Sequence, residues 1–409
     1  MKVLIYEHVS GGGFAGTPIP PSVLSEGFSM LRSLAADFKA AEHHVTALLD
    51  SRIAKLKPPL DVDCIVPVLA PHEAQEVICR NASSADAVYV IAPESEGVLQ
   101  SLLELVEQAG GVSLNCEASV IGKVADKAFL HELLSENDVP TPETVVFSAD
   151  AAVDEVKRAV RGKLRFPLVF KPSCDVSCGG LSLVRNEQQI VAAMAKILWE
   201  CVSKHFLVQE FIRGAAVSVS LISTGRDVMP ISLNRQDIEL GTPDATSSYR
   251  GGLAPFEDSL RSKAFATAEK IVKSFRGLKG YVGVDLILTN DEAFVVEVNP
   301  RLTTSYVGLR RIVNFNPAEV IVNAVLKRQL PTSVQTCGYA LFSKVELPPP
   351  TSKALQAMYA ISEVVAPPFP LSNSRACALI SAYGATVNAA AARFREAEKR
   401  VFEAAQGGE

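Results

Sequence analysis

Short apolar runs separated by amphipathic stretches make up the first part of the chain. Branched apolar runs of strand length lie at residues 2–6, 44–49, 63–69 and 86–92. Apolar positions at helical spacing lie between them, as in residues 22–41 and 97–109. Strands that alternate with helices are typical of a parallel sheet with helices on its faces. We therefore expect a first α/β domain over residues 1–124.

The pattern changes after residue 124, where strands begin to dominate. Asp126 is placed to cap a helix with apolar residues at helical spacing, ended by Val139-Pro-Thr-Pro. The runs that follow predict strands at 144–147, 167–171, 180–184, 205–210 and 217–223, with helices near 150–161 and 187–201. This order predicts an α+β region over residues 125–330, with a first lobe that ends near residue 210.

The last part of the chain closes this region and then extends it. A helix over 257–275 precedes two strand runs, 280–289 and 293–299, which Asn290-Asp291-Glu292 joins as a hairpin. A helix over 317–326 closes the unit. Residues 330–350 are expected to form a proline-rich join. Residues 331–409 are then a C-terminal extension of unassigned role, ending in an alanine-rich helix over 388–406.

Composition narrows the class of protein. The chain has 409 residues, of which 48% are hydrophobic, so several packed domains can form without disulfides or a structural metal. Its eight cysteines lie singly, as in a reducing cytoplasm. The start, Met-Lys-Val-Leu-Ile-Tyr-Glu-His, predicts a first strand rather than a signal peptide, and no apolar stretch is long enough to span a bilayer.

The net charge of the chain indicates which classes of partner it is suited to bind. A net charge of −5 argues against a nucleic acid or an anionic membrane as partner. We expect a cytoplasmic enzyme that acts on small molecules, either as a monomer or as a homodimer.

The predicted hairpin carries the most informative polar residues. Alternation along the second strand puts Glu297, Asn299 and Arg301 on one face, and the partner strand can place Asp285 beside them. Carboxylate and amide oxygens suit Mg²⁺, which completes its shell with phosphate oxygens and water; Mn²⁺ is an alternative ion. An arginine there can meet negative charge that develops during phosphoryl transfer. The alternative is an ordinary surface hairpin on which Arg301 pairs with Glu297.

Two lysines and a small-residue loop fit a phosphate site. Lys171 ends an apolar strand and is followed by Ser-Cys-Asp-Val-Ser-Cys and the glycines Gly179 and Gly180, a loop that lets backbone N–H groups approach a phosphate. Lys127 lies in the first turn of its helix, where it does not help the helix dipole, so a ligand is indicated. Each lysine alone could equally be a surface side chain.

Other features of this region are less distinctive. Cys174 and Cys178 are interpreted as small loop residues, because no histidine lies within ten positions to activate them. The strand exit Gln209-Glu210-Phe211-Ile212 can offer backbone N–H and C=O groups to an adenine edge.

In this order, the residues resemble the ATP-grasp superfamily of carboxylate–amine ligases over about residues 1–330. The resemblance implies an α/β domain followed by two lobes that clamp ATP. It also implies phosphorylation of a carboxylate and attack of an amine on the acyl phosphate. The residues that match the family's sites are Lys127 and Lys171 for the ATP phosphates, Gln209, Glu210, Phe211 and Ile212 for adenine, Asp285, Glu297 and Asn299 for Mg²⁺, and Arg301 for the acyl phosphate. Ala215 and Ala216 stand where many members have an acidic residue for the ribose, so that partner is unassigned.

Three further segments resemble the ATP-grasp group that contains tyramine–glutamate ligase of methanofuran biosynthesis. These segments are Glu-His-Val-Ser10-Gly11-Gly12-Gly13, Ser-Glu-Gly-Phe-Ser-Met-Leu at 25–31, and Tyr-Arg-Gly-Gly-Leu-Ala-Pro at 249–255. The resemblance implies that the γ-carboxylate of glutamate is activated and that tyramine, or a tyrosine-like amine, attacks. Another ligase of this superfamily that joins two amino acids is the alternative.

Further polar residues near these segments have two interpretations each. Arg235 and Arg250 are candidates for binding the α-carboxylate of an amino acid, or else surface arginines. Thr303, Thr304 and Ser305 either bond the transferred phosphate or cap the following helix.

A different class of enzyme is suggested by Gly11-Gly-Gly-Phe-Ala-Gly16, which matches the G-x-G-x-x-G pattern of an NAD(P)-dependent oxidoreductase. Thr17-Pro-Ile-Pro-Pro21 breaks the chain where the helix should begin. Asp50 is also further from the loop than the ribose-binding acid should be. The loop is therefore interpreted as a substrate or lid element. A non-catalytic nucleotide-binding protein is a third alternative.

Overall fold

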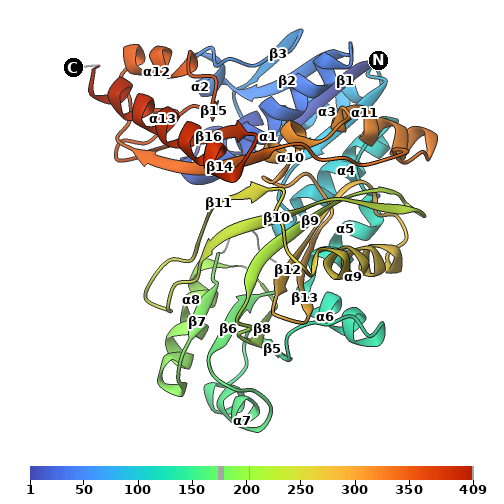
Figure 1. Cartoon of the computed structure of the whole chain (residues 1–409), viewed down its shortest axis with the longest axis vertical. Coiled ribbons are helices and arrows are strands. Elements are labelled where there is room, and N and C mark those ends of the chain that lie inside the picture. Colours follow the sequence, from blue (N-terminus) through green and yellow to red (C-terminus); the bar gives the residue numbers. More distant parts are fainter. Residues whose placement is uncertain (174–178, 202, 408–409) are drawn as a thin grey trace.

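The computed structural model describes residues 1–173, 179–201 and 203–407. Cys174 and Cys178, interpreted above as small loop residues, lie outside this described part. The molecule has an upper body, which contains both termini, and a lower lobe (Figure 1).

The front domain is built on a parallel sheet. Its strands β1 (Lys2–Glu7), β2 (His44–Asp50), β3 (Cys64–Val68) and β4 (Ala87–Ile91) lie in the order β3-β2-β1-β4. Helices α1 (Pro21–Ala40), α2 (Ser51–Ala54), α3 (Pro71–Ala82), α4 (Val98–Gln108) and α5 (Ala118–Ala125) accompany them, with short helical turns η1 (Val9–Gly13) and η2 (Ser95–Gly97). The predicted parallel α/β arrangement is confirmed, since the apolar runs form its strands, of which β1, β2 and β4 are largely buried and the edge strand β3 is mostly exposed.

The lower lobe is a separate antiparallel sheet. Its strands β5 (Thr144–Ser148), β6 (Leu168–Pro172), β7 (Ser182–Val184) and β8 (His205–Glu210) lie in the order β5-β8-β6-β7. The helices here are α7 (Val153–Lys163) and α8 (Ile190–Glu200), with the turn η3 (Glu187–Gln189), whereas α6 (Lys127–Glu136) precedes the lobe and buries its apolar side chains in the core of the upper body. The lobe has its own core, in which the rings of Phe147, Phe170 and Phe206 stack.

The largest sheet joins the second lobe to the C-terminal part. Strands β9 (Ala215–Thr224), β10 (Val228–Glu239), β11 (Ser248–Ala254), β12 (Lys279–Leu288), β13 (Ala293–Asn299), β14 (Tyr339–Leu347), β15 (Val364–Ala366) and β16 (Ala376–Gly384) lie in the order β13-β12-β9-β10-β11-β14-β16-β15. The accompanying helices are α9 (Arg261–Ser274), α10 (Tyr306–Ile312), α11 (Pro317–Val322), α12 (Ser352–Tyr359) and α13 (Val387–Gln406), with the turn η4 (Asn323–Lys327).

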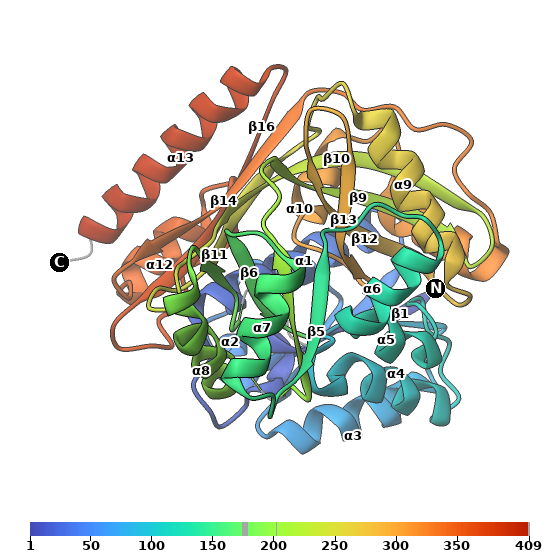
Figure 2. The same ribbon diagram turned by 90° about the horizontal axis from the view of Figure 1, so that it is seen from below.

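The C-terminal residues extend this sheet. The expected proline-rich join over 330–350 is wrong in part, because residues 339–347 form β14, which pairs with β11 and β16. Ala340, Phe342, Val345 and Leu347 of β14 are buried, and this apolar pattern outweighs the prolines that follow at 348–350. Helix α13 lies along β14 and β16 (Figure 2). The domain boundary at residue 330 stays a prediction, although strands from before and after this boundary belong to one sheet.

The front domain and the second lobe are packed together through buried groups. Asp37 on α1 accepts hydrogen bonds from the Tyr306 hydroxyl (2.7 Å) and from Nε of Arg310 (2.9 Å), both on α10. Apolar side chains from α1, β1, α10 and α11 share one core. This packing fixes the end of β1 and helix α1 against the strands that carry the predicted metal-binding residues.

Candidate active site

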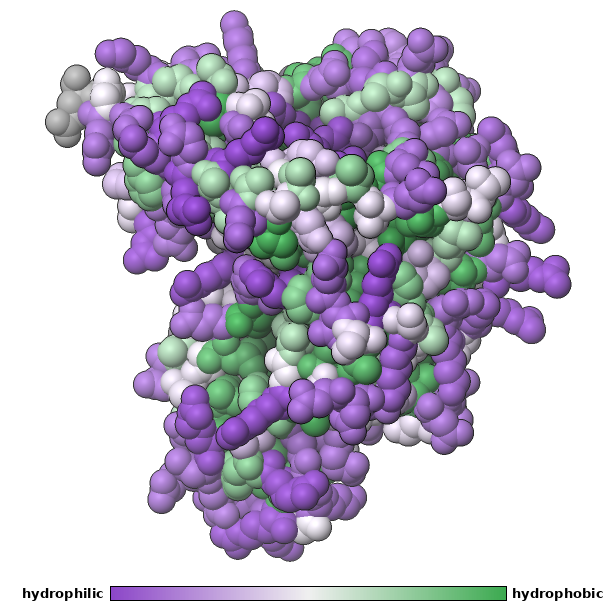
Figure 3. Space-filling model, in the orientation of Figure 1, coloured by the Kyte–Doolittle hydropathy of each residue, from purple (hydrophilic) through white to green (hydrophobic). Residues whose placement is uncertain are grey.

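A cavity of about 860 Å³ lies between the front domain and the two lobes. Apolar side chains come to the surface around the notch between the upper body and the lower lobe (Figure 3). The cavity is lined by most of the predicted site residues: Lys127, Lys171, Gly179, Gln209, Glu210, Phe211, Ile212, Asp285, Glu297, Asn299, Arg301, Thr303, Thr304 and Ser305. Gly180, Arg235, Arg250 and residues 10–13 are not in its lining.

The predicted metal-binding residues of the cavity come from the β12–β13 hairpin. Asp285 lies opposite Glu297 in the antiparallel register. Nδ2 of Asn299 and Nε2 of Gln236 each donate to the Asp285 carboxylate, both at 3.1 Å. Burial and the neighbouring charge of Glu297 raise the pKa of Asp285 to about 7. A bound cation beside these two carboxylates would favour the ionised form of Asp285.

The two lysines contact the same hairpin. Nζ of Lys127 lies 2.9 Å from Oε1 of Glu297, and Nζ of Lys171 donates to the carbonyl of Val296 at 3.3 Å. Burial, together with the charge of Lys127, lowers the pKa of Lys171 to about 7. Burial acts to raise the pKa of Glu297, but the charges of both lysines outweigh it and leave that pKa lowered. The lysines are buried site groups rather than surface side chains.

The N-terminus of α6 explains how Lys127 reaches the cavity. The Asp126 carboxylate accepts from the Ala128 N–H at 2.9 Å, which confirms the predicted helix cap. The Lys127 N–H donates to the Ser173 carbonyl at 3.0 Å, just after β6. The start of the helix is therefore tied to the strand that carries Lys171.

Arg301 is anchored by the front domain. Its Nε lies 2.9 Å from Oε2 of Glu94, and its Nη1 donates to the Leu302 carbonyl at 3.1 Å. The side chains of Arg301 and Glu94 are only 15% and 7% exposed. The alternative of a surface pair between Arg301 and Glu297 is wrong. Sequence reasoning missed Glu94, because its contact joins positions 207 residues apart.

The strand exit at 209–212 has its own structural partners. Nε2 of Gln209 donates to Oγ1 of Thr144 at 2.8 Å, and the N–H groups of Glu210 and Phe211 donate to the carbonyls of Glu143 and Pro167. Within the described ranges, the N–H of Ile212 makes no such bond. The peptide groups available to a ligand are therefore fewer than the sequence pattern implies.

The polar residues after β13 bind other side chains. Oγ1 of Thr303 lies 3.0 Å from the Tyr281 hydroxyl, and Oγ of Ser305 lies 3.1 Å from Oγ of Ser218. Oγ1 of Thr304 donates to Oε2 of Glu26 at 3.1 Å. The side chain of Ser305 does not cap α10. The cap interpretation is therefore wrong for Ser305, which precedes the helix.

Arg235 and Arg250 lie on the surface beside acidic neighbours. Nε of Arg235 lies 3.1 Å from the Asp237 carboxylate, and Arg250 forms an ion pair with Glu239. The side chain of Arg250 is 66% exposed. A role in binding a substrate carboxylate stays a prediction for both.

The glycine loop after β1 is packed inside the front domain. An added Cβ would lie 2.8 Å from the Tyr6 ring at Gly11, 2.5 Å from Val68 at Gly12 and 2.2 Å from the His8 ring at Gly13. Gly12 also has a φ of +108°. The glycines therefore allow close packing, and their role in substrate binding, with that of Ser10, stays a prediction.

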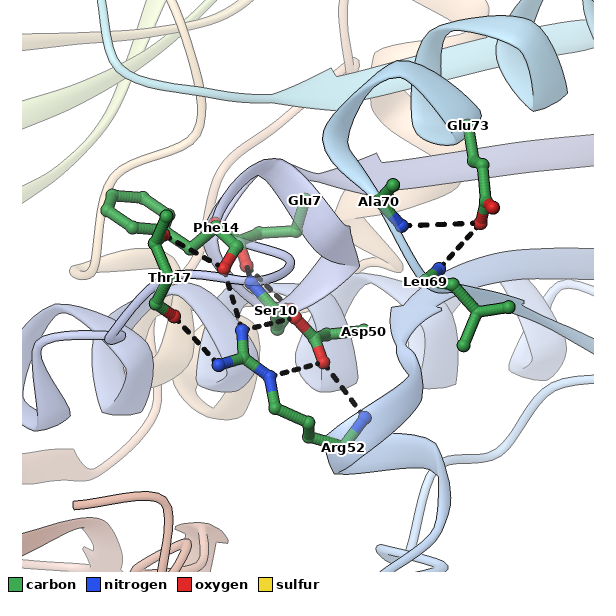
Figure 4. Close-up of polar contacts among 9 residues, drawn as sticks. All are labelled: Glu7, Ser10, Phe14, Thr17, Asp50, Arg52, Leu69, Ala70 and Glu73. Carbon is green, nitrogen blue, oxygen red and sulfur yellow. Dashed lines mark hydrogen bonds and ion pairs between the residues drawn. The ribbon is translucent and has the colours of Figure 1, made fainter.

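Asp50 and Arg52 hold this loop in place (Figure 4). Arg52 binds the Asp50 carboxylate through Nε and Nη2, at 2.9 and 2.7 Å, and donates to the carbonyls of Phe14 and Thr17. The Asp50 carboxylate is thus bound by Arg52 rather than available to a ribose. Helix α1 begins only at Pro21 and not at the loop. Both observations oppose the oxidoreductase alternative.

The comparisons with known proteins agree with this geometry. A family model described as ATP-grasp domain matches residues 124–305, and one described as pre ATP-grasp 3 domain matches residues 43–121. The chain belongs to the ATP-grasp superfamily, and it is an ATP-dependent ligase that forms C–N bonds.

Curated relatives make the similarity more specific. Tyramine–L-glutamate ligase of Methanocaldococcus jannaschii is 28% identical over 335 residues, 81% of this chain and 92% of the relative. The same enzyme of Methanocaldococcus fervens is 30% identical over 311 residues, 75% of this chain and 89% of the relative. D-alanine–D-alanine ligase of Carboxydothermus hydrogenoformans is 28% identical over 217 residues, 50% of this chain and 66% of the relative.

Solved structures share the fold at low identity. An ATP-grasp superfamily protein from Archaeoglobus fulgidus aligns with a TM-score of 0.62 and 22% identity, covering 93% of this chain and 99% of that chain. Biotin carboxylase from Campylobacter jejuni aligns with a TM-score of 0.71 and 14% identity, covering 97% of this chain and 90% of that chain. No helix among the described residues is long and apolar enough to cross a membrane.

Proposed function

We propose that this enzyme joins the γ-carboxylate of glutamate to the amine of tyramine, or of a tyrosine-like relative, in methanofuran biosynthesis. ATP first phosphorylates the carboxylate, and the amine then displaces phosphate from the acyl phosphate. The observation that carries the proposal is the single cavity in which two lysines, the acidic hairpin and Arg301 converge. The similarity to two tyramine–L-glutamate ligases supports the choice of substrates.

The donor set of the hairpin fits Mg²⁺. Asp285, Glu297 and Asn299 are its proposed ligands, because they offer two carboxylates and an amide oxygen on one sheet face. The raised pKa of Asp285 supports this fit, since a divalent cation would favour the ionised form of the pair. When bound, the ion would offset phosphate charge during transfer. A solved biotin carboxylase domain of Hydrogenobacter thermophilus contains MgADP, and Mn²⁺ is the alternative ion here.

The side chains of the cavity have distinct proposed tasks. Lys127 and Lys171 bind the phosphates of ATP, and residues Gln209–Ile212 with the loop at Gly179 and Gly180 enclose the nucleotide. Arg301 faces the negative charge of the acyl phosphate, to which a guanidinium can donate two hydrogen bonds. Catalysis comes from the orientation of the substrates inside the cavity and from the fixed positive charges of the lysines and Arg301. No nucleophilic Ser or Cys is therefore required.

A second substrate pair is favoured by one relative. The match to D-alanine–D-alanine ligase supports the alternative that two amino acids are joined. The same ATP residues would serve both reactions, because a substrate can change while the nucleotide site stays the same. A cytoplasmic location and a homodimer complete the proposal; the Hydrogenobacter thermophilus biotin carboxylase domain is described as a dimer.

A coupled ADP-release assay tests the proposal. Purified enzyme with ATP and Mg²⁺ is screened against pairs of one amino acid and one amine, and products are identified by mass. The proposal expects γ-glutamyltyramine from glutamate and tyramine. An α-linked product would contradict the proposed regiochemistry, and a dipeptide as the main product would favour the alternative substrate pair.

A further inference from the structure

The cavity changes chemical character along its length. At the lobes, it is lined by the lysines and the acidic hairpin. At the front domain, the lining is mostly apolar and comes from the end of β1, helix α1 and the segment after β4. These apolar residues are Val9, Phe14, Val23, Met30, Ile91 and Pro93.

Helix α1 presents one face to this end of the cavity. Its lining residues are Val23, Glu26, Gly27 and Met30, which are spaced i, i+3, i+4 and i+7. The face is thus apolar at both ends, with a carboxylate and a glycine between them. An added Cβ at Gly27 would lie 2.5 Å from Oε1 of Glu7, so the glycine leaves room for that buried carboxylate.

Glu26 is the acidic residue on this face of α1, and its carboxylate can accept a further hydrogen bond from a ligand. The Glu7 carboxylate accepts three hydrogen bonds within its own turn, from Val9 N–H (3.0 Å) and from both N–H and Oγ of Ser10 (2.7 and 2.6 Å). Glu26 accepts one bond per oxygen, from Lys344 at 2.7 Å and from Thr304 at 3.1 Å, which leaves lone pairs unused. Its side chain is 16% exposed.

The contact with Thr304 places Glu26 beside the reaction centre. Thr304 lies three residues after Arg301 and five residues after the end of β13, the strand that carries Glu297. A group held by the Glu26 carboxylate therefore lies close to the proposed acyl phosphate. Tyr249 also lines the cavity. The ring of Tyr249 lies 5.6 Å from Nζ of Lys344.

Phe14 forms a fixed part of the apolar wall. Its carbonyl accepts from Nη2 of Arg52 at 2.7 Å (Figure 4). Its ring packs edge-on against His8, with 5.8 Å between the ring centroids. Because both its backbone and its ring are held by other residues, Phe14 is already in position before an apolar ligand binds.

We propose that this front-domain end of the cavity is the amine subsite, where Val23, Met30 and Phe14 enclose the aromatic body of a primary amine and Glu26 holds its nitrogen. The inference rests on the proposed function. The Glu26 carboxylate forms an ion pair with Lys344 and can accept a further hydrogen bond, which an amine N–H donates and a substrate carboxylate cannot. The apolar wall selects an amine with an aromatic or similarly bulky body.

Hydroxylamine distinguishes a defect in the amine subsite from a defect elsewhere in the enzyme, because it reacts with an acyl phosphate without needing an apolar pocket. Val23→Phe narrows the subsite, and Glu26→Gln removes the charge at nearly unchanged shape. For each variant, tyramine amide formation and glutamyl hydroxamate formation are measured, with the KM for ATP. Val191→Phe, on the half-exposed outer side of α8, is the matched control for adding an aromatic ring.

For Val23→Phe, the ratio of tyramine amide to hydroxamate formation is expected to fall about tenfold or more. Glu26→Gln is expected to raise the KM for tyramine about tenfold, with the KM for ATP changed less than about twofold. Equal losses in both reactions, or no change in either, would overturn the amine subsite. Absence of glutamyl hydroxamate with the unmodified enzyme would instead overturn the proposed function.

Discussion

Glu94 is expected to act as a positioning residue for Arg301. It lies in the front domain, directly after the Pro93 that follows β4, whereas Arg301 follows β13 in the second lobe. The pair binds through Nε of Arg301, and Nη2 has no partner in the described part of the chain. Glu94 thus orients the guanidinium so that its outer edge is available to the acyl phosphate.

The size of the effect follows from the burial of the pair. A hydrogen bond to a charged partner contributes about 1.5–3 kcal/mol, and one between neutral groups contributes about 1 kcal/mol. Glu94→Gln keeps an oxygen acceptor but loses the charge, which costs about 0.5–2 kcal/mol, so kcat should fall about twofold to 30-fold. Glu94→Ala also loses the acceptor, so kcat should fall about tenfold to 150-fold.

Steady-state kinetics with saturating glutamate and tyramine measure this effect. The KM for ATP should change less than about twofold, because Glu94 does not line the nucleotide end of the cavity. Glu96→Gln is the matched control, since Glu96 is exposed and two residues away. A wild-type kcat for Glu94→Ala would refute the positioning role. Parallel loss of kcat and of thermal stability, without partial rescue by Gln, would indicate a merely structural pair.

The remaining predictions concern the site lysine, the hairpin and the packing of the front domain. Lys171→Met should weaken ATP binding at least about tenfold by calorimetry, and unchanged affinity would contradict its role. Because the pKa of Lys171 is lowered to about 7 and phosphates favour the charged form, ATP binding should take up a proton and weaken as the pH rises from about 7 to 9. Calorimetry in buffers of different ionisation enthalpy measures this uptake, which Lys171→Met should abolish. Glu297→Gln should abolish ligation while the circular dichroism spectrum and Tm stay unchanged, and an active variant would mean that the metal site is misplaced. Asp37→Ala should cost about 3–5 kcal/mol of unfolding free energy by leaving Arg310 unpaired. The exposed Glu107→Gln is its control in a denaturant titration, and equal stability of the two variants would contradict this estimate of the buried pair.

The sequence predicts best those features that follow from local periodicity. The strand predicted at 205–210 and the run predicted at 293–299 coincide with β8 and β13, because a short run rich in apolar and branched residues marks a strand directly. The same alternation places Asp285 opposite Glu297, and the register confirms that expectation. The chain thus encodes the core of the candidate site within one hairpin.

Features that depend on distant contacts were missed. Strands β10 and β11 were not predicted, and β14 was obscured by the neighbouring prolines. Glu26 and Glu94 could not be assigned, because their partners Lys344 and Arg301 lie 318 and 207 residues away. Spacing along the chain carries no signal for such pairs, which form only when the front domain packs against the second lobe.

The most direct test of the central claim is the dependence of ADP release on both co-substrates. Enzyme, ATP and Mg²⁺ are incubated with glutamate alone, with tyramine alone and with both, and ADP and the organic product are measured together. We expect sustained ADP release only when glutamate and tyramine are both present, with one ADP formed for each γ-glutamyltyramine. Sustained ADP release without amide formation, or amide formation without ATP, would contradict it.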